Sequence, residues 1–135
     1  MTAPRRLRTP RALALLATLL CAAGVAGCDR TEAGRKAWDA GRADDALAAW
    51  NAAATAAGDD ASPELLYDRA LAALRTGDLT LAASAADAAA RRGGDAFAPR
   101  CDDVRGHVAF ARSEAMELEA AKPGAPPTTL DKALA

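Results

Sequence analysis

The chain is poor in the residues that build β-sheets. Aromatic side chains make up 4% of its 135 residues, and β-branched residues are also few, whereas alanine dominates. Strands favour valine, isoleucine, threonine and aromatic residues, and alanine has the highest helix propensity of any residue. The composition therefore predicts an all-α fold and excludes a protein built on a sheet.

Histidine is also scarce, and this limits the chemistry that the chain can perform. The one histidine, His107, cannot form a metal site without cysteine or carboxylate ligands at suitable spacing. Asp103 lies four residues earlier, on the same helical face, where a surface ion pair is the simpler interpretation. The sequence has no phosphate-binding loop and no nucleophile motif. We therefore expect a protein that is not an enzyme and has no cofactor, metal or small-molecule substrate.

The first 27 residues have the order of a secretory signal. A block with four arginines and no acidic residue, residues 5–11, precedes an uncharged apolar run from Ala12 to Gly27. This run of sixteen residues is shorter than the roughly 20 apolar residues that a transmembrane helix needs. Residues 1–27 are therefore predicted to direct export and to be removed.

Residues 25–28, Val-Ala-Gly-Cys, resemble the lipobox of bacterial lipoproteins. The resemblance implies cleavage after Gly27, diacylation of the Cys28 sulfur and a lipidated anchor over residues 28–30. It places the mature protein on a bacterial membrane, facing the periplasm or the cell exterior, and leaves the choice between inner and outer membrane open. An ordinary secretory signal with a cysteine nearby is the alternative.

Removal of the signal leaves an acidic protein. The whole chain has 17 basic and 18 acidic residues, and the signal takes four arginines with it, so 13 basic residues remain against 18 acidic ones. Nucleic acid and anionic headgroups repel such a surface on average. We therefore expect no nucleic-acid partner and attachment to the membrane through two acyl chains. Cys101, the other cysteine of the mature chain, is predicted to be a small packing residue.

Caps and breakers divide the mature chain into five helices. They are expected over residues 31–41, 43–58, 62–77, 78–94 and 99–122. Thr31, Ser62 and Asp78 are the expected N-caps, and glycine is expected to end most of these helices. Residues 123–135 are predicted to form a proline-rich linker and a short tail.

Small and large residues recur along these helices with an offset of 36 residues. Gly41 and Gly77 stand at two equivalent turns between helices. The offset also aligns Gly34 with Ala70 and Gly106, Ala37 with Ala73 and Ala109, Trp38 with Leu74 and Phe110, Ala46 with Ala82, and Ala53 with Ala89. Small residues at fixed points let two helices approach closely. The pattern therefore predicts a helical solenoid over residues 31–122.

This pattern resembles the tetratricopeptide repeat. The family's small residue, turn glycine, alanine, aromatic residue and second alanine match Gly34, Gly41, Ala46, Trp50 and Ala53 in the first repeat, and Ala70, Gly77, Ala82, Ala86 and Ala89 in the second. The chain departs from the family in its 36-residue spacing, where 34 is usual, and in Ala86, where an aromatic residue is typical. The resemblance implies a short solenoid of about two and a half helical hairpins. Trp50 is expected to fill the space between the first two hairpins, beside Ala70 and Ala73.

The third repeat is incomplete. Ser113 replaces the turn glycine, and the fifth helix is expected to run on to Ala121, which leaves an apolar stripe without cover. The stripe comprises Val104, Val108, Ala111 and Met116. The fifth helix could itself be the cap, residues 128–135 could fold back over it, or the chain could continue beyond this sequence. Eight residues are too few for a stable isolated helix, which favours an exposed stripe around Val108 and Met116.

The resemblance implies a binding function without catalysis, because the A helices of this family line a concave face that takes a peptide or a partner's helix. Candidate groove residues are those that packing does not need: Arg35, Asp39, Arg69, Arg105 and Arg112. Arg69 and Arg105 are 36 residues apart and either form a basic ladder for a carboxylate-bearing peptide or are scattered surface arginines. The expected function is a membrane-anchored scaffold or adaptor with an unidentified protein or peptide partner. A structural or truncated lipoprotein fragment without binding activity is the alternative.

Overall fold

Five α-helices follow one another between residues 29 and 123. The computed structural model describes residues 29–123. A first helix covers residues 29–39 and is followed by α2 (Ala43–Ala57), α3 (Pro63–Thr76), α4 (Leu79–Gly93) and α5 (Ala98–Ala120), with short 3-10 turns at Gly58–Asp60 and Gly94–Ala96. No residue from 29 to 123 lies in a strand. The prediction of an all-α fold is confirmed.

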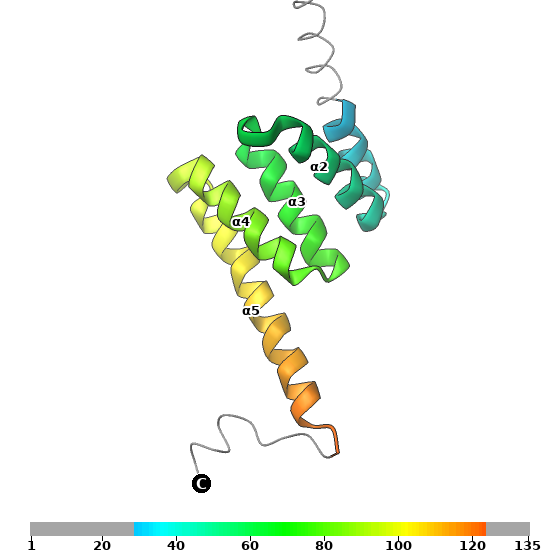
Figure 1. Ribbon diagram of the computed structural model, residues 1–135, viewed down its shortest axis with the longest axis vertical. Helices are drawn as coiled ribbons and strands as arrows, with labels where there is room; N and C mark the ends of the chain where they lie inside the picture. The colour runs from blue at the N-terminus through cyan, green and yellow to red at the C-terminus, as the bar shows by residue number, and fades with distance from the viewer. Residues whose placement is uncertain (1–28, 124–135) are drawn as a thin grey trace, which may run out of the picture.

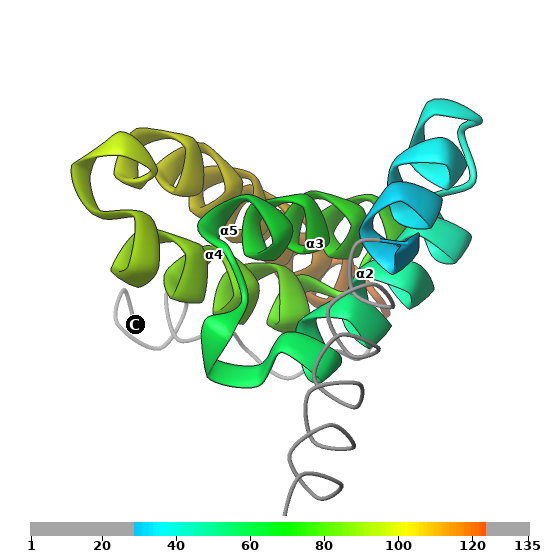
Figure 2. The same ribbon diagram turned by 90° about the horizontal axis from the view of Figure 1, so that it is seen from above.

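The helices pack in two rows. Seen from above, the first helix, α3 and α5 form one row, and α2 and α4 form the other (Figure 2). Consecutive helices contact each other from α2 to α5, and α3 also contacts α5 within its own row. Because the connections are short, each helix runs antiparallel to the one before it (Figure 1).

Local sequence signals explain most helix ends. Ser62 and Asp78 each accept a hydrogen bond from the backbone N–H three residues further on, so both predicted N-caps are confirmed. Gly41 and Gly77 have φ angles of 74° and 84°, in the left-handed region that residues with a Cβ adopt at a cost. These two glycines therefore turn the chain between neighbouring helices, as the repeat pattern predicts.

The first helix differs from the prediction at its start. Residues 29 and 30 are already helical, so Thr31 lies inside the helix and its predicted role as N-cap is wrong. Neither Asp29 nor Arg30 breaks a helix, and a negative side chain is favourable near a helix N-terminus. Helical structure thus extends to the residue directly after Cys28.

Alanine fills most of the core. The alanines with no exposed surface are Ala46, Ala70, Ala72, Ala73, Ala82, Ala86 and Ala89. A side chain of one methyl group lets two helix backbones approach closely, because the distance between helix axes depends on the side chains at the contact. Gly34, Ala37 and Ala53 are also buried. The small residues that the repeat pattern aligns in the first two hairpins therefore lie in the core.

Trp50 is buried where α2 packs on the first helix. Its side chain is 3% exposed, and its ring lies so close to Gly34 that a Cβ at that position would lie 2.3 Å from Trp50 Nε1. Nε1 also donates a hydrogen bond to the Thr31 carbonyl at 3.2 Å. The predicted burial is confirmed. The ring occupies the space left by the missing side chain of Gly34, within the first hairpin. The sequence pattern instead predicts that the ring lies beside Ala70 and Ala73 of α3.

The third repeat departs from the pattern of the first two. Gly106 and Phe110, which align with residues packed in the earlier hairpins, are exposed, Phe110 by 64%. Val104 and Val108 are buried on the side of α5 that meets α3 and α4, so the predicted uncovered stripe is wrong for both valines. The prediction of an uncovered side chain is confirmed for Met116, which is 67% exposed. The 36-residue offset does not predict that Gly106 and Phe110 are exposed, because no helix from 29 to 123 packs on the other side of α5.

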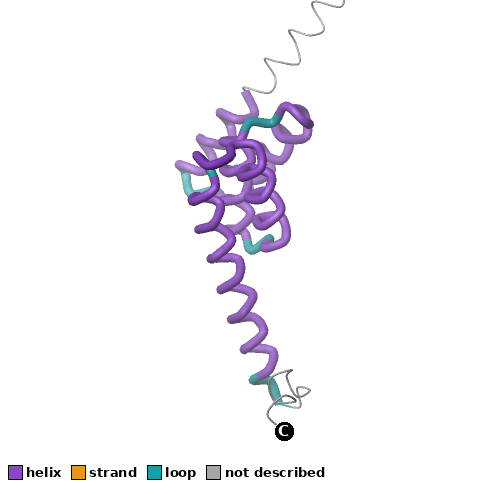
Figure 3. The backbone as a smooth tube through the Cα atoms, turned by 90° about the vertical axis from the view of Figure 1, so that its left-hand side faces the viewer, coloured by secondary structure: helices purple, strands orange, loops and turns teal. Residues whose placement is uncertain are grey.

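The second part of α5 extends beyond the other helices (Figure 1 and Figure 3). α5 has 23 residues against 14 in α3, which makes it about 13 Å longer at about 1.5 Å per residue. Every side chain from residue 112 to residue 120 is exposed, including Leu118 at 70%. We call this segment, residues 112–120, the free half of α5.

Candidate functional site

The predicted anchor and the described residues do not overlap. The signal over residues 1–27, the lipidation site Cys28 and the tail from residue 124 lie outside the residues that the structure describes. Between residues 29 and 123, no helix combines the length and the apolar character that crossing a bilayer requires. The candidate site in the described part of the chain is therefore the surface around the predicted groove residues.

The structure separates the five predicted groove residues. Arg35 and Asp39 are exposed on the first helix, and Arg112 is exposed on the free half of α5. Arg69 on α3 and Arg105 on α5 are half-buried and point toward helices of the other row. Two of the predicted groove residues therefore bond to the other row of helices, and three are exposed.

Arg69 and Arg105 make equivalent contacts one repeat apart. Arg69 Nε donates a hydrogen bond to Oδ1 of Asn51 on α2 at 2.5 Å. Arg105 Nε donates to Oδ1 of Asp87 on α4 at 2.8 Å. Asn51 and Asp87 are themselves 36 residues apart. Each arginine thus joins its helix to the helix before it, and the same polar contact recurs with the period of the repeat.

Arg105 also stabilises its own helix. Its Nη1 donates to Oδ1 of Asp102 one turn earlier, and the hydrogen bonds with Asp87 and Asp102 raise the pKa of the guanidinium. Cys101 lies in the core as a free thiol with no exposed surface, and burial raises its pKa. Its predicted role as a packing residue is confirmed. His107, also on α5, is exposed.

A second group of charged residues lies where the first helix faces α3. Burial raises the pKa of the Asp68 carboxyl on α3, and the positive charge of Arg35 on the first helix acts in the opposite direction. Arg75, two turns further along α3, places its guanidinium carbon 5.5 Å from the ring centre of Trp38, a cation–π distance. We call this surface the first-helix/α3 face. It comprises Arg35, Trp38, Asp68 and Arg75.

Part of this face could be predicted from the sequence. Arg75 stands 36 residues after Asp39, so the repeat position that selects Asp39 as a groove residue also selects Arg75. Glu64, Asp68 and Arg75 follow at spacings of four and seven residues, which places them on one side of a helix. The pattern did not show that Trp38 would meet Arg75, because that contact depends on how the first helix packs on α3.

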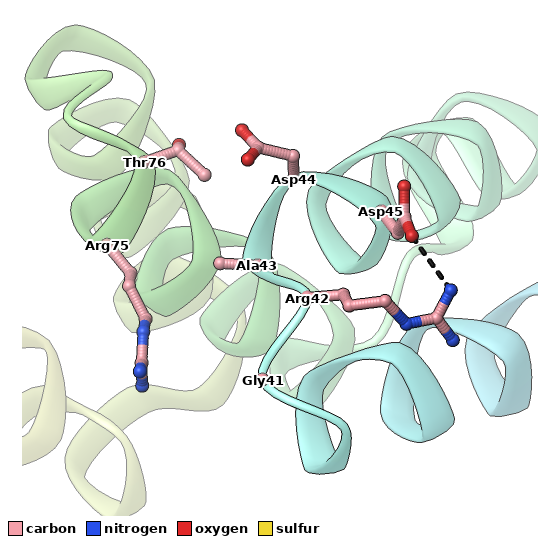
Figure 4. A pocket seen from close by; sticks show the side chains of 7 residues that line it. All are labelled: Gly41, Arg42, Ala43, Asp44, Asp45, Arg75 and Thr76. Carbon is pink, nitrogen blue, oxygen red and sulfur yellow. Dashed lines mark hydrogen bonds and ion pairs between the residues drawn. The ribbon is translucent and has the colours of Figure 1, made fainter.

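An open hollow of about 510 Å³ lies beside the turn between the first helix and α2 (Figure 4). It is lined by Gly41, Arg42, Ala43, Asp44, Asp45, Arg75 and Thr76. Arg42 Nη1 binds Oδ2 of Asp45 at 2.9 Å, and Arg75 stacks on Trp38. Figure 4 shows the two arginines extending in different directions, so the charged groups do not converge on one ligand position. The described residues also contain no group of three side chains that could hold a metal ion.

Comparisons with known proteins found no relative. No protein-family description matches the chain, and neither a curated protein nor a solved structure matches it. Function is therefore inferred from the residues and geometry of this chain alone.

Proposed function

We propose that the protein is a lipid-anchored, non-catalytic interaction scaffold of a bacterial envelope, with Cys28 as the lipidated residue and tetratricopeptide-like hairpins as the binding domain. The observation that carries the binding domain is the polar contact repeated at Asn51–Arg69 and Asp87–Arg105. It supports an array of hairpins that pack alike. Arrays of this kind present extended surfaces to their partners. The proposed partner is a peptide or a helix of another protein.

The first-helix/α3 face is the surface proposed to take this partner. It combines the half-buried ring of Trp38, over which Arg75 lies, with the charged side chains of Arg35 and Asp68. Tryptophan and arginine are enriched among the residues that contribute most to binding in protein interfaces. The arginines bonded to α2 and α4 do not belong to this surface. Mixed charge around an aromatic ring suits a peptide that carries both charged and apolar side chains.

Affinity capture from detergent-solubilised membranes of the native cells tests the binding function. A partner retained in constant ratio by the wild-type chain and lost from an Arg35→Glu variant would support the scaffold. Arg91→Glu is the matched control, because Arg91 is exposed on α4 in the other row and the charge changes equally. Repeated failure of the wild-type chain to retain a partner would favour a structural lipoprotein without binding activity of its own.

Palmitate labelling tests the anchor. The Cys28→Ala chain should incorporate no radiolabelled palmitate and should accumulate as unprocessed precursor or as protein released from the membrane. Cys101→Ala is the control, since this buried thiol plays no part in the proposed lipidation. A wild-type chain that never incorporates palmitate would overturn the lipoprotein proposal.

A further inference from the structure

We infer that the anchored domain stands on the bilayer without a linker, with the end that carries residue 29 facing the lipid and the free half of α5 directed away from it. The inference rests on the proposed lipidation of Cys28. It adds to that proposal the orientation of the domain and the surface that meets the lipid headgroups.

The first step concerns the covalent connection between Cys28 and the first helix. Residue 29 is helical and follows Cys28 directly, so the Cα atoms of these two residues are about 3.8 Å apart. A flexible tether of about ten residues would instead span roughly 16–19 Å on average. No such tether separates the proposed lipid from the first helix. The domain therefore cannot move away from the bilayer surface.

The second step is the attachment of the first helix to the rest of the domain. Trp50 of α2 packs against Gly34 and donates its hydrogen bond to the Thr31 carbonyl. Arg75 of α3 lies over the ring of Trp38. The first helix is thus held by α2 and by α3. The direction in which the lipid leaves the first helix therefore sets the direction of the whole domain.

The third step identifies the loops at the membrane end. The first helix and α2 run antiparallel, and the contact between Thr31 and Trp50 places these residues at the same level. α2 continues for seven residues past Trp50 to Ala57, about 10 Å at about 1.5 Å per residue. The loop that begins at Gly58 therefore lies at the end that carries residue 29, as Figure 1 also shows.

Arg92 at the end of α4 holds this loop in place. Its Nη1 donates to the Ala61 carbonyl at 2.6 Å, and its Nη2 lies 3.9 Å from Oδ1 of Asp59. Because Arg92 precedes the turn at Gly94–Ala96, the α2–α3 and α4–α5 loops lie side by side. Together with residue 29 they form one end surface.

This end surface does not attract anionic lipid by its charge. The exposed charged residues there are Asp29, Asp59, Asp60 and Asp95 together with Arg30, Arg91, Arg92 and Arg100. Juxtamembrane lysine and arginine clusters favour anionic leaflets, and here the acidic residues offset the arginines in number. The short covalent connection, and not electrostatic attraction, sets the orientation.

The last step concerns α5. It begins at this end surface with Ala98 and runs for 23 residues, about 35 Å at about 1.5 Å per residue. Its free half therefore lies on the side of the domain far from residue 29 (Figure 1 and Figure 3). In the anchored protein, Met116 and Leu118 face the aqueous compartment, where a soluble partner reaches them and the lipid does not.

Fluorescence quenching by spin-labelled headgroup lipid tests the orientation. The full chain is processed in bacteria, purified and reconstituted in vesicles, with Cys101→Ala as background and one fluorophore attached through Asp60→Cys or Leu118→Cys. Both positions are exposed. Because the two positions lie at opposite ends of the domain, quenching should be several-fold stronger at position 60 than at position 118. Equal quenching at both positions would overturn the orientation.

Two further measurements separate this inference from the lipid anchor itself. A Gly-Ser linker of about twelve residues, inserted after Asp29, adds roughly 20 Å of free tether and should abolish the difference between the two positions. The mass of the N-terminal peptide shows whether the acyl chains are present. A chain without acyl mass would overturn the anchor, whereas equal quenching in a chain with acyl mass would overturn the orientation alone.

Discussion

Gly34 and Gly106 occupy the same position of the repeat but have opposite surroundings. A Cβ at Gly34 would lie 2.3 Å from Trp50 Nε1, whereas a Cβ at Gly106 would meet no atom within 4 Å. We expect Gly106→Ala to stabilise the domain by up to about 1 kcal/mol, because glycine is unfavourable inside a helix. Gly34→Ala should destabilise it by about 1–3 kcal/mol, because the tryptophan ring must move out of a packed core.

Thermal unfolding followed by circular dichroism measures both effects. For a domain of this size, 1 kcal/mol corresponds to a shift of about 4–8 °C in the midpoint. The two variants add the same methyl group to a helix, so their difference isolates the contact with Trp50. A Gly34→Ala midpoint equal to that of Gly106→Ala would contradict the close packing of the first helix on α2.

Asp68 gives the stability of the domain a predictable dependence on pH. Burial raises its pKa in the folded state above the ordinary value of 3.8, even with Arg35 nearby. Between the pKa of Asp68 in the unfolded chain and its higher pKa in the folded chain, the folded chain binds more protons than the unfolded chain. The free energy of unfolding therefore falls as the pH rises through this range. At neutral pH the charged carboxylate is destabilising. Asp68→Asn should raise the midpoint at pH 7, and this gain should fade as the pH is lowered toward about 4.

Melting curves of Asp68→Asn between pH 3 and pH 7 check this expectation. Asp60→Asn is the control, since Asp60 is exposed in the α2–α3 loop and surface substitutions usually change stability little. A loss of stability in Asp68→Asn at pH 7 would mean that the attraction to Arg35 outweighs the cost of burial.

Among the helices, the two repeated polar contacts should differ in their response to salt. Asn51–Arg69 pairs a neutral side chain with a cation, and Asp87–Arg105 pairs two opposite charges. Partly exposed pairs of this kind contribute about 0.2–1 kcal/mol. Double-mutant cycles with alanine should give a coupling of this size for both pairs. Raising the salt concentration should reduce only the Asp87–Arg105 coupling, because mobile ions screen charge pairs most.

The free half of α5 should open more readily than the remainder of the helix. Val104 and Val108 pack in the core, whereas residues 112–120 make no buried contact. Low-stability segments are those with few buried apolar contacts and exposed backbone hydrogen bonds. We expect slow hydrogen exchange across residues 64–91 and 101–108, and fast exchange across residues 112–120. Strong protection of the free half, together with Leu130 and Leu134, would show that residues 128–135 cover it.

Helix ends followed from the sequence wherever a single side chain determines them. Ser62 and Asp78 supply the acceptors that cap α3 and α4, and the turn glycines relieve the strain of a left-handed backbone. Thr31 could also cap a helix, but Asp29 and Arg30 are compatible with helix, and a capping residue alone does not start one. Local helix propensity does not decide whether the first helix begins at residue 29 or at Thr31.

The candidate site was less predictable, because it depends on how the helices rotate against one another. The 36-residue offset identified Arg69 and Arg105 as equivalent, and their contacts are equivalent in the structure. It did not show that both would turn toward the preceding helix, because Asn51 and Asp87 lie 18 residues away in sequence. Side chains so far apart along the chain become neighbours only through packing.

At the scale of the whole molecule, the buried residues between 29 and 123 form one continuous cluster. Buried residues extend without a break from Ala37 in the first helix to Val108 in α5. Both tryptophans of the chain belong to the first hairpin. Because a small single-core domain unfolds cooperatively, tryptophan fluorescence and circular dichroism should report the same unfolding midpoint in urea.

Gly34→Ala should lower both midpoints together, because the first helix belongs to the same buried cluster as α3 and α4. Fluorescence that changes at lower urea than circular dichroism, in this variant or in the wild type, would show that the first hairpin unfolds on its own. That result would contradict the single cluster.

The alanine core also restricts how this protein can change over evolutionary time. A buried leucine can be replaced by several residues of similar volume. A buried alanine with no exposed surface, such as Ala72 or Ala82, leaves no space for a larger side chain and has only glycine, serine or cysteine near it in size. Glycine weakens the helix by about 1 kcal/mol. Amino-acid substitutions are therefore confined to the outer faces of the helices. New binding surfaces can arise there while the composition of the interior stays almost fixed.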